Sequence, residues 1–356
     1  MGNGDKTQML VHIEKNLDYQ SFDVRWIPNS ARLVVLGSNT DATGCIEIME
    51  MSSGKLDSLC KTKYPYAVKC GTFRASSTAA RQLAFGDFHG HLQVVDLSQP
   101  EKILYSVKAH HRVLNTIDGV GGLDIGRGAP ELVTGGADGR VKVWDLRQSD
   151  GPVVTIAPQE GTHQPDCWAV AAGNAHSPEE RVVASGFDNG DIRLFDLRTN
   201  KVMWGANVGN GVCSLDFDRR DIMMNKLVAT VLEANIHIFD LRTLDANNQF
   251  AFKSVLAHKS TVWCARHLPQ NRDIWVTTGG NGSLMLWKYV YPAKRSVKDA
   301  TGNLMGVPGN ADCLASLTAS TQPITNFDWN ADFAGLGAFS AIDQILRVTI
   351  ATNLPS

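Results

Sequence analysis

Two stretches of this chain repeat one pattern, TGGADGRVKVWDLR at residues 134–147 and ASGFDNGDIRLFDLR at residues 184–198. Each has turn-forming Gly, Asp or Asn within its first seven residues, continues with apolar residues at every second position, and ends with Asp-Leu-Arg. Apolar alternation with a period of two predicts a half-buried strand that follows a tight turn. One such unit cannot bury its apolar face alone, so the repeat constrains the fold more than any other feature of the chain.

The pattern occurs seven times, in complete or degenerate form, with closing positions at residues 50, 96, 145, 196, 240, 288 and 350. The intervals of 44 to 62 residues leave room for four strands per repeat, and further apolar strands such as PELVTGG and VCSLDF precede the repeated one. We therefore expect an all-β, seven-bladed propeller that forms a single domain over residues 1–356.

The two ends of the chain predict how the ring closes. After the last repeated strand only ATNLPS remains, which is too short for another strand, whereas QMLVHIEK at residues 8–15 is a spare apolar strand. We expect this N-terminal strand to complete the last blade and so remove the exposed sheet edges. Residues 289–320 are longer than a connection needs, and we expect a mobile insertion in the last blade there.

The acids of the repeat are best explained as structural. In the third repeat His110, Thr134, Asp138 and Trp144 have the spacing of the hydrogen-bond tetrad of WD-repeat propellers. The sixth repeat offers an equivalent set with an amide in place of the acid, namely His258, Thr277, Asn281 and Trp287. Such a chain of donors and acceptors satisfies buried polar groups. Because Phe195 replaces the Trp in the fourth repeat, the copies need not all be complete, as expected of a structural device.

Composition and motifs argue against several function classes. The 34 Lys and Arg nearly balance the 36 Asp and Glu, so we expect no nucleic-acid partner, and no apolar run reaches the length of a membrane span. The Gly-rich residues 118–131 lack a phosphate-binding motif, and the histidines 89, 91, 110 and 111 lack cysteines at zinc spacing. The seven scattered cysteines suggest free thiols in the cytoplasm. We expect a non-enzymatic, cytoplasmic monomer without cofactor or metal.

A ring of side chains at the mouth of the central channel is the first candidate for binding a protein partner. Alignment of the seven innermost strands puts one residue from each at this mouth: Phe22, Lys69, Asn115, Trp168, Cys213, Trp263 and Thr325. Aromatic anchors beside cations are typical of interaction hot spots, and Arg112 and Lys259 add charge nearby. The alternative is that these side chains only pack between neighbouring blades.

The second candidate lies on the opposite face, where Arg147, Arg198 and Arg242 end the repeated Asp-Leu-Arg. Such sequences resemble the docking box of WD-repeat substrate receptors for cullin-RING ubiquitin ligases. The alternative is that each Arg braces its own turn.

Stretches that the repeat does not require carry a narrower resemblance. These are NGVCSLDFDRRDIMMNKLVAT, AHKSTVWCARHLPQNRD, TIDGVGGLDIGRGAPELVTGG, ERVVASGFDNGDIRLFDLR and LWKYVYPAKRS. They resemble the Monad-type WD-repeat family, over loops as well as strands. The resemblance implies a cofactor for cytoplasmic preassembly of axonemal dynein in cilia and flagella, with dynein heavy chains as clients. It also implies that the chain works together with a co-chaperone complex that contains RuvB-like ATPases, a prefoldin-like module and tetratricopeptide-repeat cofactors. A link to apoptosis is a further implication of the resemblance. It carries over no catalytic residues.

Overall fold

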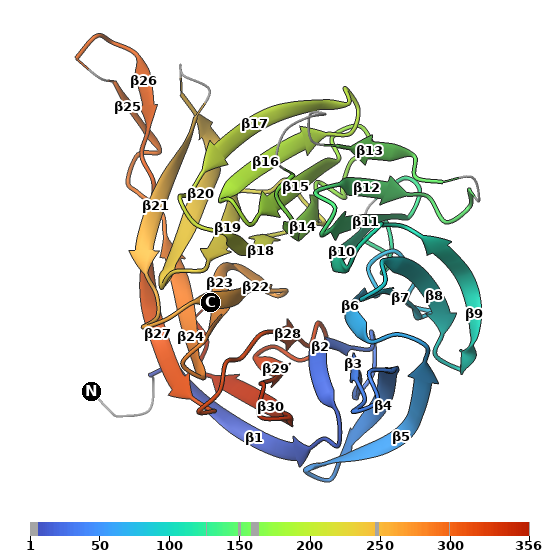
Figure 1. Ribbon diagram of the computed structural model, residues 1–356. Helices are drawn as coiled ribbons and strands as arrows, with labels where there is room; N and C mark the ends of the chain where they lie inside the picture. Colours follow the sequence, from blue (N-terminus) through green and yellow to red (C-terminus); the bar gives the residue numbers. More distant parts are fainter. Residues whose placement is uncertain are drawn as a thin grey trace.

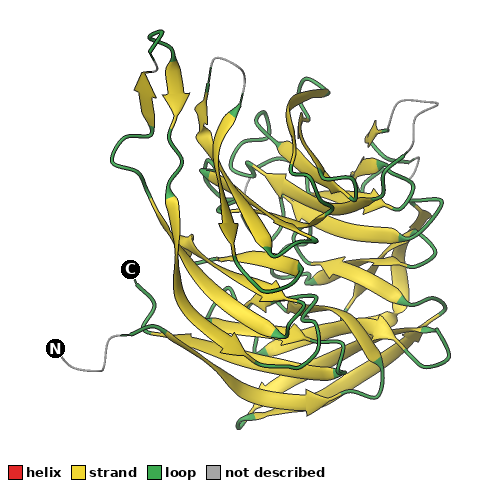
Figure 2. Cartoon of the chain, turned by 60° about the vertical axis from the view of Figure 1, so that its left-hand side comes forward, coloured by secondary structure: helices red, strands yellow, loops and turns green. Residues whose placement is uncertain are grey.

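The computed structural model describes residues 6–125, 127–148, 151–157, 164–245, 249–298 and 300–355. Within these ranges every regular element is a strand, and Figure 2 shows strands and loops alone. Seven four-stranded antiparallel sheets are arranged as blades around a central axis, which Figure 1 views end on. Thus the predicted all-β, seven-bladed propeller is confirmed. None of the described segments is a helix long and apolar enough to reach across a bilayer.

The first three blades take their strands in chain order from the channel outward. Blade one consists of β2 (Gln20–Trp26), β3 (Arg32–Ser38), β4 (Gly44–Ser52) and β5 (Lys55–Tyr64). Blade two consists of β6 (Val68–Thr72), β7 (Gln82–Asp87), β8 (His91–Asp96) and β9 (Gln99–Lys108). Blade three consists of β10 (Leu114–Val120), β11 (Glu131–Gly136), β12 (Val141–Trp144) and β13 (Val154–Ile156).

The next two blades follow the same order, and blade six departs from it only in its outermost strand. Blade four consists of β14 (Cys167–Gly173), β15 (Val182–Phe187), β16 (Asp191–Asp196) and β17 (Lys201–Asn207). Blade five consists of β18 (Val212–Phe217), β19 (Lys226–Val231), β20 (Asn235–Leu244) and β21 (Phe250–Leu256). Blade six consists of β22 (Val262–Leu268), β23 (Asn271–Gly279), β24 (Ser283–Val290) and β27 (Asn310–Thr318), with the hairpin β25 (Ser296–Lys298) and β26 (Leu304–Gly306) inserted before β27.

Blade seven joins the two ends of the chain. It consists of β28 (Asp328–Trp329), β29 (Leu336–Ser340), β30 (Ile345–Thr352) and, outermost, β1 (Gln8–Asn16). Arg347 Nε donates to Glu14 Oε1 at 2.8 Å across the β1–β30 pair, and Thr349 Oγ1 donates to the Leu10 carbonyl at 2.8 Å. The predicted closure by the N-terminal strand is therefore confirmed.

The segment 289–320 lies in the sixth blade and not, as its place in the sequence suggested, in the last. It contains the end of β24, the hairpin β25–β26 and the whole of β27, the outermost strand of blade six. The outermost strand of a repeat has no turn signature of its own, so the sequence pattern did not show where blade six ends.

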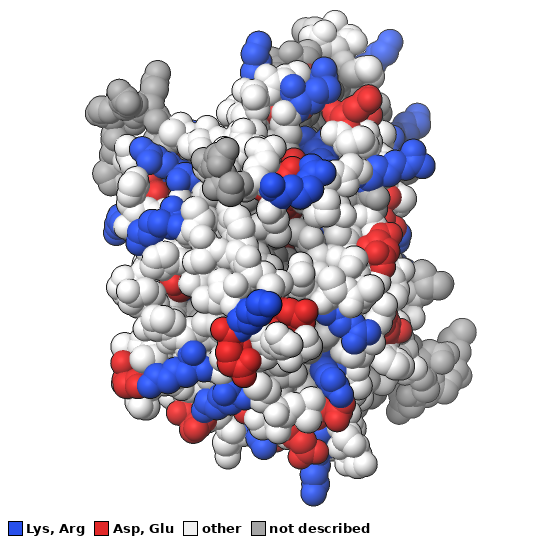
Figure 3. Space-filling model, turned by 90° about the vertical axis from the view of Figure 1, so that its right-hand side faces the viewer, with Lys and Arg blue, Asp and Glu red and all other residues white. Residues whose placement is uncertain are grey.

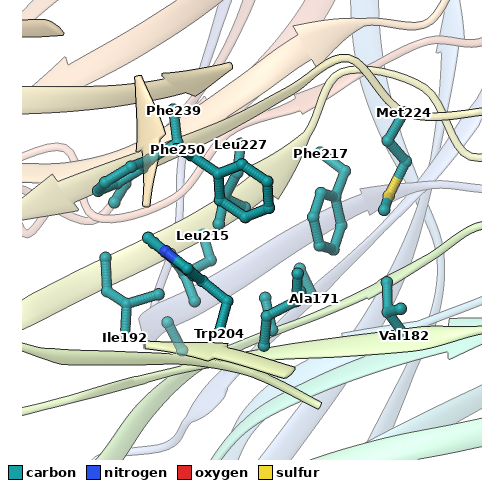
Figure 4. Packing of buried hydrophobic residues seen from close by; sticks show 14 of the residues in the cluster. Ala171, Val182, Ile192, Trp204, Leu215, Phe217, Met224, Leu227, Phe239 and Phe250 are labelled. Carbon is teal, nitrogen blue, oxygen red and sulfur yellow. The ribbon is translucent and has the colours of Figure 1, made fainter. Parts of the chain in front are cut away.

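The hydrophobic core lies between neighbouring blades, because each sheet buries both faces. Figure 4 shows the cluster between blades four and five, where Trp204 of β17 packs against Phe239 and Phe250 with ring centres 5.1 Å away in each case. Each fully buried large side chain contributes roughly 1.5–3 kcal/mol. On the side of the molecule in Figure 3, Lys and Arg are interspersed with Asp and Glu.

Candidate functional site

A β-bulge at the start of six of the seven inner strands places side chains at the mouth of the channel. In β2, for example, the pairing with β3 skips from Ser21 to Asp23, and five other inner strands show the same shift. A bulge leaves its extra residue unpaired and redirects the side chain. The six skipped residues are Phe22, Lys69, Asn115, Trp168, Cys213 and Trp263.

The structure brings all seven residues that were expected at the mouth to one cavity. Together with Thr325, which follows the isolated bridge at Ile324, the six bulge residues line a central cavity of about 980 Å³. Each of the seven is partly exposed. Their side chains are therefore not wholly used in packing between blades.

Aromatic rings surround a cation on one side of this mouth. Phe22 lies 5.0 Å from Phe88 between ring centres, and the Lys69 ammonium lies 5.3 Å from the first ring centre and 5.6 Å from the second. Burial lowers the pKa of Lys69, against the opposing effect of Asp23. An ammonium that is partly desolvated against aromatic faces is suited to a carboxylate from a partner.

Three apolar residues of the mouth were not foreseen from the sequence. Phe88, Leu232 and Ile342 occupy equivalent positions in the turns after β7, β19 and β29, where each backbone N–H donates to a carbonyl that precedes the inner strand of its own blade. Leu232 is 37% exposed and Ile342 is 47% exposed, and both line the cavity. An alignment of the first turn residue in each repeat would have revealed them.

Two other predicted residues lie apart from the cavity. Arg112 is exposed and its guanidinium donates to the Ala137 carbonyl at 2.9 Å, and Lys259 is also exposed. Neither of them lines the cavity.

Deeper in the channel, four aspartates tie neighbouring blades together. Each is on an inner strand and accepts a hydrogen bond from a backbone N–H of the following blade. The bonds join Asp23 to Gly71 at 3.0 Å, Asp118 to Ala172 at 2.8 Å, Asp216 to His267 at 2.8 Å and Asp328 to Trp26 at 2.9 Å.

Arginines neutralise these aspartates within the chain. Asp118 contacts Arg74 at 2.9 Å and Arg220 at 2.6 Å. Burial alone raises the pKa of Asp118, but Arg220 and Arg74 overcome this effect and hold it well below its usual range. Asp118 is therefore ionised and already paired, and a carboxylate in this state is a poor general acid or base.

The thiol at the mouth is not disposed to act as a nucleophile. Burial, together with a smaller effect of the neighbouring Cys264, raises the pKa of Cys213 to about 12. The thiolate is the reactive form, so Cys213 is inert near neutral pH. Among the described residues no group of three His, Cys, Asp or Glu side chains is arranged to hold a metal ion.

In blade three the four residues of the predicted tetrad are hydrogen-bonded in series. Trp144 Nε1 donates to Thr134 Oγ1 at 2.9 Å, and that oxygen lies 2.9 Å from His110 Nε2. His110 Nδ1 lies 2.8 Å from Asp138 Oδ1, and this carboxylate also accepts the backbone N–H of His111. Asp138 thus has a structural role.

Blade six has the same series with one additional residue. Trp287 Nε1 donates to Thr277 Oγ1 at 2.9 Å, and this oxygen lies 2.8 Å from His258 Nε2. His258 Nδ1 lies 2.9 Å from Ser283 Oγ, which donates to Asn281 Oδ1 at 2.7 Å. The sequence reasoning missed Ser283, although its place two residues after Asn281 was the available signal.

The three arginines of the repeated Asp-Leu-Arg lie exposed in the turns or strand ends that follow their aspartates. In each, the aspartate accepts the backbone N–H of the Arg two residues later: Arg147 at 3.0 Å, Arg198 at 2.8 Å and Arg242 at 3.0 Å. The Arg147 guanidinium also contacts Asp145 at 2.6 Å. The Arg147 guanidinium thus braces its own turn, whereas the Arg242 guanidinium donates to Asn225 Oδ1 at 3.2 Å.

Comparison with known proteins agrees with this geometry. Residues 86–145 and 251–288 match the family model described as WD domain, G-beta repeat. The chain is 53% identical over 350 residues to the Dynein axonemal assembly factor 10 of Bos taurus and 52% identical over 350 residues to that of Homo sapiens. It is 46% identical over 351 residues to the protein of the same name from Chlamydomonas reinhardtii. In all three comparisons the match covers 98% of each chain.

Proposed function

Because this chain belongs to the family of dynein axonemal assembly factor 10, we propose that it is a non-enzymatic scaffold for the assembly of axonemal dynein. The observation that carries the proposal is similarity over almost the whole length of relatives that bear this name, from a mammal to an alga. The propeller supports a binding role, because its channel is built of paired charges and its mouth of partly exposed apolar residues.

We further propose where in the cell the chain acts and which proteins it binds. The chain acts in the cytoplasm as a monomer, beside a chaperone assembly with RuvB-like ATPases, a prefoldin-like module and tetratricopeptide-repeat cofactors. Axonemal dynein heavy chains are its clients, and motile cilia and flagella depend on the product. The resemblance of the loop sequences to the Monad-type family supports these partners.

We place the contact with a partner at the channel mouth. Trp168 and Trp263 project there from bulges in blades four and six, and Phe22, Phe88 and Lys69 form the opposite side. Aromatic side chains on a rigid frame bury much apolar area with little loss of conformational entropy. The cation at Lys69 favours a partner segment that presents a carboxylate next to an apolar side chain.

Genetic replacement in ciliated cells tests both levels of the proposal. Cells whose own copy has been removed receive the unchanged chain, the double variant Trp168→Ala with Trp263→Ala, or the control Leu256→Ala, which alters an exposed residue on the outer strand β21. Dynein heavy chains in the axoneme are then quantified. We expect the unchanged chain and the control to restore them and the double variant to fail.

The outcomes separate the two claims. If the unchanged chain does not restore dynein arms, the assembly role is wrong. If the double variant melts at the same temperature as the unchanged chain and restores the arms equally well, only the site at the mouth is wrong. Proximity labelling in the same cells is expected to enrich RuvB-like ATPases and dynein heavy chains, and enrichment of cullin components in their place would contradict the proposed partners.

A further inference from the structure

The hairpin β25–β26 stands outside the ring, beyond the outer strands of blades five and six (Figures 1 and 2). Its base is nevertheless held in place. Gly306 lies so close to blade five that a Cβ there would be 2.8 Å from Ala251 Cβ and 2.9 Å from Thr243 Cβ. Arg295 lies 3.8 Å from Asp240, and its guanidinium lies 4.9 Å from the centre of the Tyr291 ring. The base of the hairpin is therefore fixed against blade five, and its outer part projects from the ring.

The outer part of this projection exposes apolar side chains. Val297 is 46% exposed, Leu304 is 57% exposed and Met305 is 49% exposed. Val297 pairs directly with Met305, so these two side chains share one face of the hairpin, while Gly306 turns the other face toward blade five. A two-stranded hairpin has no interior in which to bury such residues.

The same projection carries positive charge. Lys294 and Lys298 are exposed and make no ion pair with any side chain in the described part of the chain, whereas Arg295 faces Asp240. A hairpin that exposes an apolar pair on one face, and ammonium groups on residues next to β25 and on its other face, complements a segment that is both acidic and apolar.

The backbone of β25 indicates which kind of partner the projection can bind. Among the described strands, β25 pairs with β26 alone, and β26 is the strand that lies against β20 and β21. The outer edge of β25 therefore presents backbone groups that an extended peptide can pair with, and a lipid surface cannot use a sheet edge in this way.

We infer that β25 is a docking edge for an extended segment of a partner protein in which acidic and apolar residues alternate. When the segment adds as a strand beside β25, its apolar residues lie on the face of Val297 and Met305. Its acidic residues lie on the opposite face, where Lys298 is exposed farther along the hairpin than Gly306. This site is separate from the channel mouth and does not rest on the function proposed for it.

A peptide-display experiment on the full chain tests the inference. A library of random short peptides is selected on the unchanged protein, and the recovered peptides are titrated against two hairpin variants, Val297→Ser with Met305→Ser and Lys294→Glu with Lys298→Glu. All four positions are exposed, so the melting temperature is expected to stay unchanged. The controls are Leu256→Ser on β21 and the mouth variant Trp168→Ala with Trp263→Ala.

We expect a class of recovered peptides that alternates acidic and apolar residues, binds about tenfold more weakly to each hairpin variant, and binds both controls like the unchanged protein. Higher salt is expected to weaken this binding further. The inference is overturned if no recovered peptide distinguishes the hairpin variants from the controls, or if the peptides that do so are not acidic. It is also overturned if vesicles of phosphatidylserine, and no peptide, bind in a manner that the hairpin variants abolish.

Discussion

At the scale of single residues, two blades satisfy buried polar side chains through hydrogen bonds in series. The tetrad of blade three passes hydrogen bonds from Trp144 to Asp138, and blade six reaches Asn281 through Ser283. A buried donor or acceptor that loses its partner costs about 1–3 kcal/mol, so each member of these series contributes to the stability of its blade.

The value of the tetrad can be measured with two matched substitutions. Trp144 and Trp275 are both fully buried, but only the Trp144 indole N–H has a hydrogen-bond partner among the described residues. We expect Trp144→Phe to lower the free energy of unfolding by about 1 kcal/mol more than Trp275→Phe, because it alone breaks a hydrogen bond. Urea unfolding of the two variants measures the difference, and equal losses would show that the tetrad bond contributes nothing.

His258 predicts a dependence of stability on pH. Burial lowers the pKa of His258 to about 4, while the hydrogen bonding toward Asn281 acts in the opposite direction. In the unfolded chain the pKa is near 6.5, so between these values the unfolded state binds a proton that the folded state does not. Stability is therefore expected to fall as the pH is lowered through this window.

We expect His258→Gln to lose less stability than the unchanged protein between about pH 7.5 and about pH 5. The control is His12→Gln, at an exposed position of β1, which is expected to follow the unchanged protein. Thermal unfolding at the two pH values provides the measurement. A His258→Gln variant with the same pH dependence as the control would contradict the assignment.

At the scale of elements, each blade follows a pattern that the sequence shows directly, and the exceptions have physical reasons. Alternating apolar residues after a Gly or Asp turn marked the repeated strand in every blade, and the spare strand at residues 8–15 marked the closure. The assignment of residues 289–320 failed because an outermost strand is identified only by its partner. Alignment of the inner strands predicted which residues lie at the mouth, but not that β-bulges place them there. The ion pairs between Asp and Arg in the channel were missed, because their partners come from different blades.

The contact between blades five and six depends on a buried cation on β19. Lys226 is fully buried, and its ammonium lies 2.7 Å from Asp273 and 2.8 Å from the Tyr291 hydroxyl. Burial alone lowers the pKa of Lys226, but Asp218 and Asp273 overcome this effect and raise it. The Lys226 ammonium is therefore charged in the folded protein, where it forms ion pairs with Asp218 and Asp273.

We expect Lys226→Met to lower the free energy of unfolding by about 3–5 kcal/mol, because it removes a fully buried cation, leaving Asp218 with Arg272 alone and Asp273 without its ion pair. The matched change Lys201→Met, at an exposed position of β17, is expected to stay within about 0.5 kcal/mol of the unchanged protein. Urea unfolding with intrinsic tryptophan fluorescence measures both. Similar stability of the two variants would show that the cluster is dispensable.

At the scale of the whole molecule, the closed ring brings the β-bulges of different blades to one place. Six blades contribute a bulge residue and blade seven contributes Thr325, so seven side chains that are far apart in the sequence line one cavity. Neither the three arginines of the Asp-Leu-Arg sequences nor the hairpin β25–β26 lines this cavity, so the surfaces proposed for partners do not overlap. This arrangement depends on the strand pair β1–β30, which joins the two ends of the chain.

Removal of residues 1–16 tests this dependence most directly, with thermal unfolding as the measurement. The deletion withdraws the buried side chains of Met9 and Ile13 and leaves the edge of β30 unpaired, so we expect a loss of at least about 3 kcal/mol in the free energy of unfolding. A synthetic peptide of residues 6–16 is expected to restore the original transition. A truncated chain that unfolds at the same temperature as the full chain would contradict closure of the ring by its first strand.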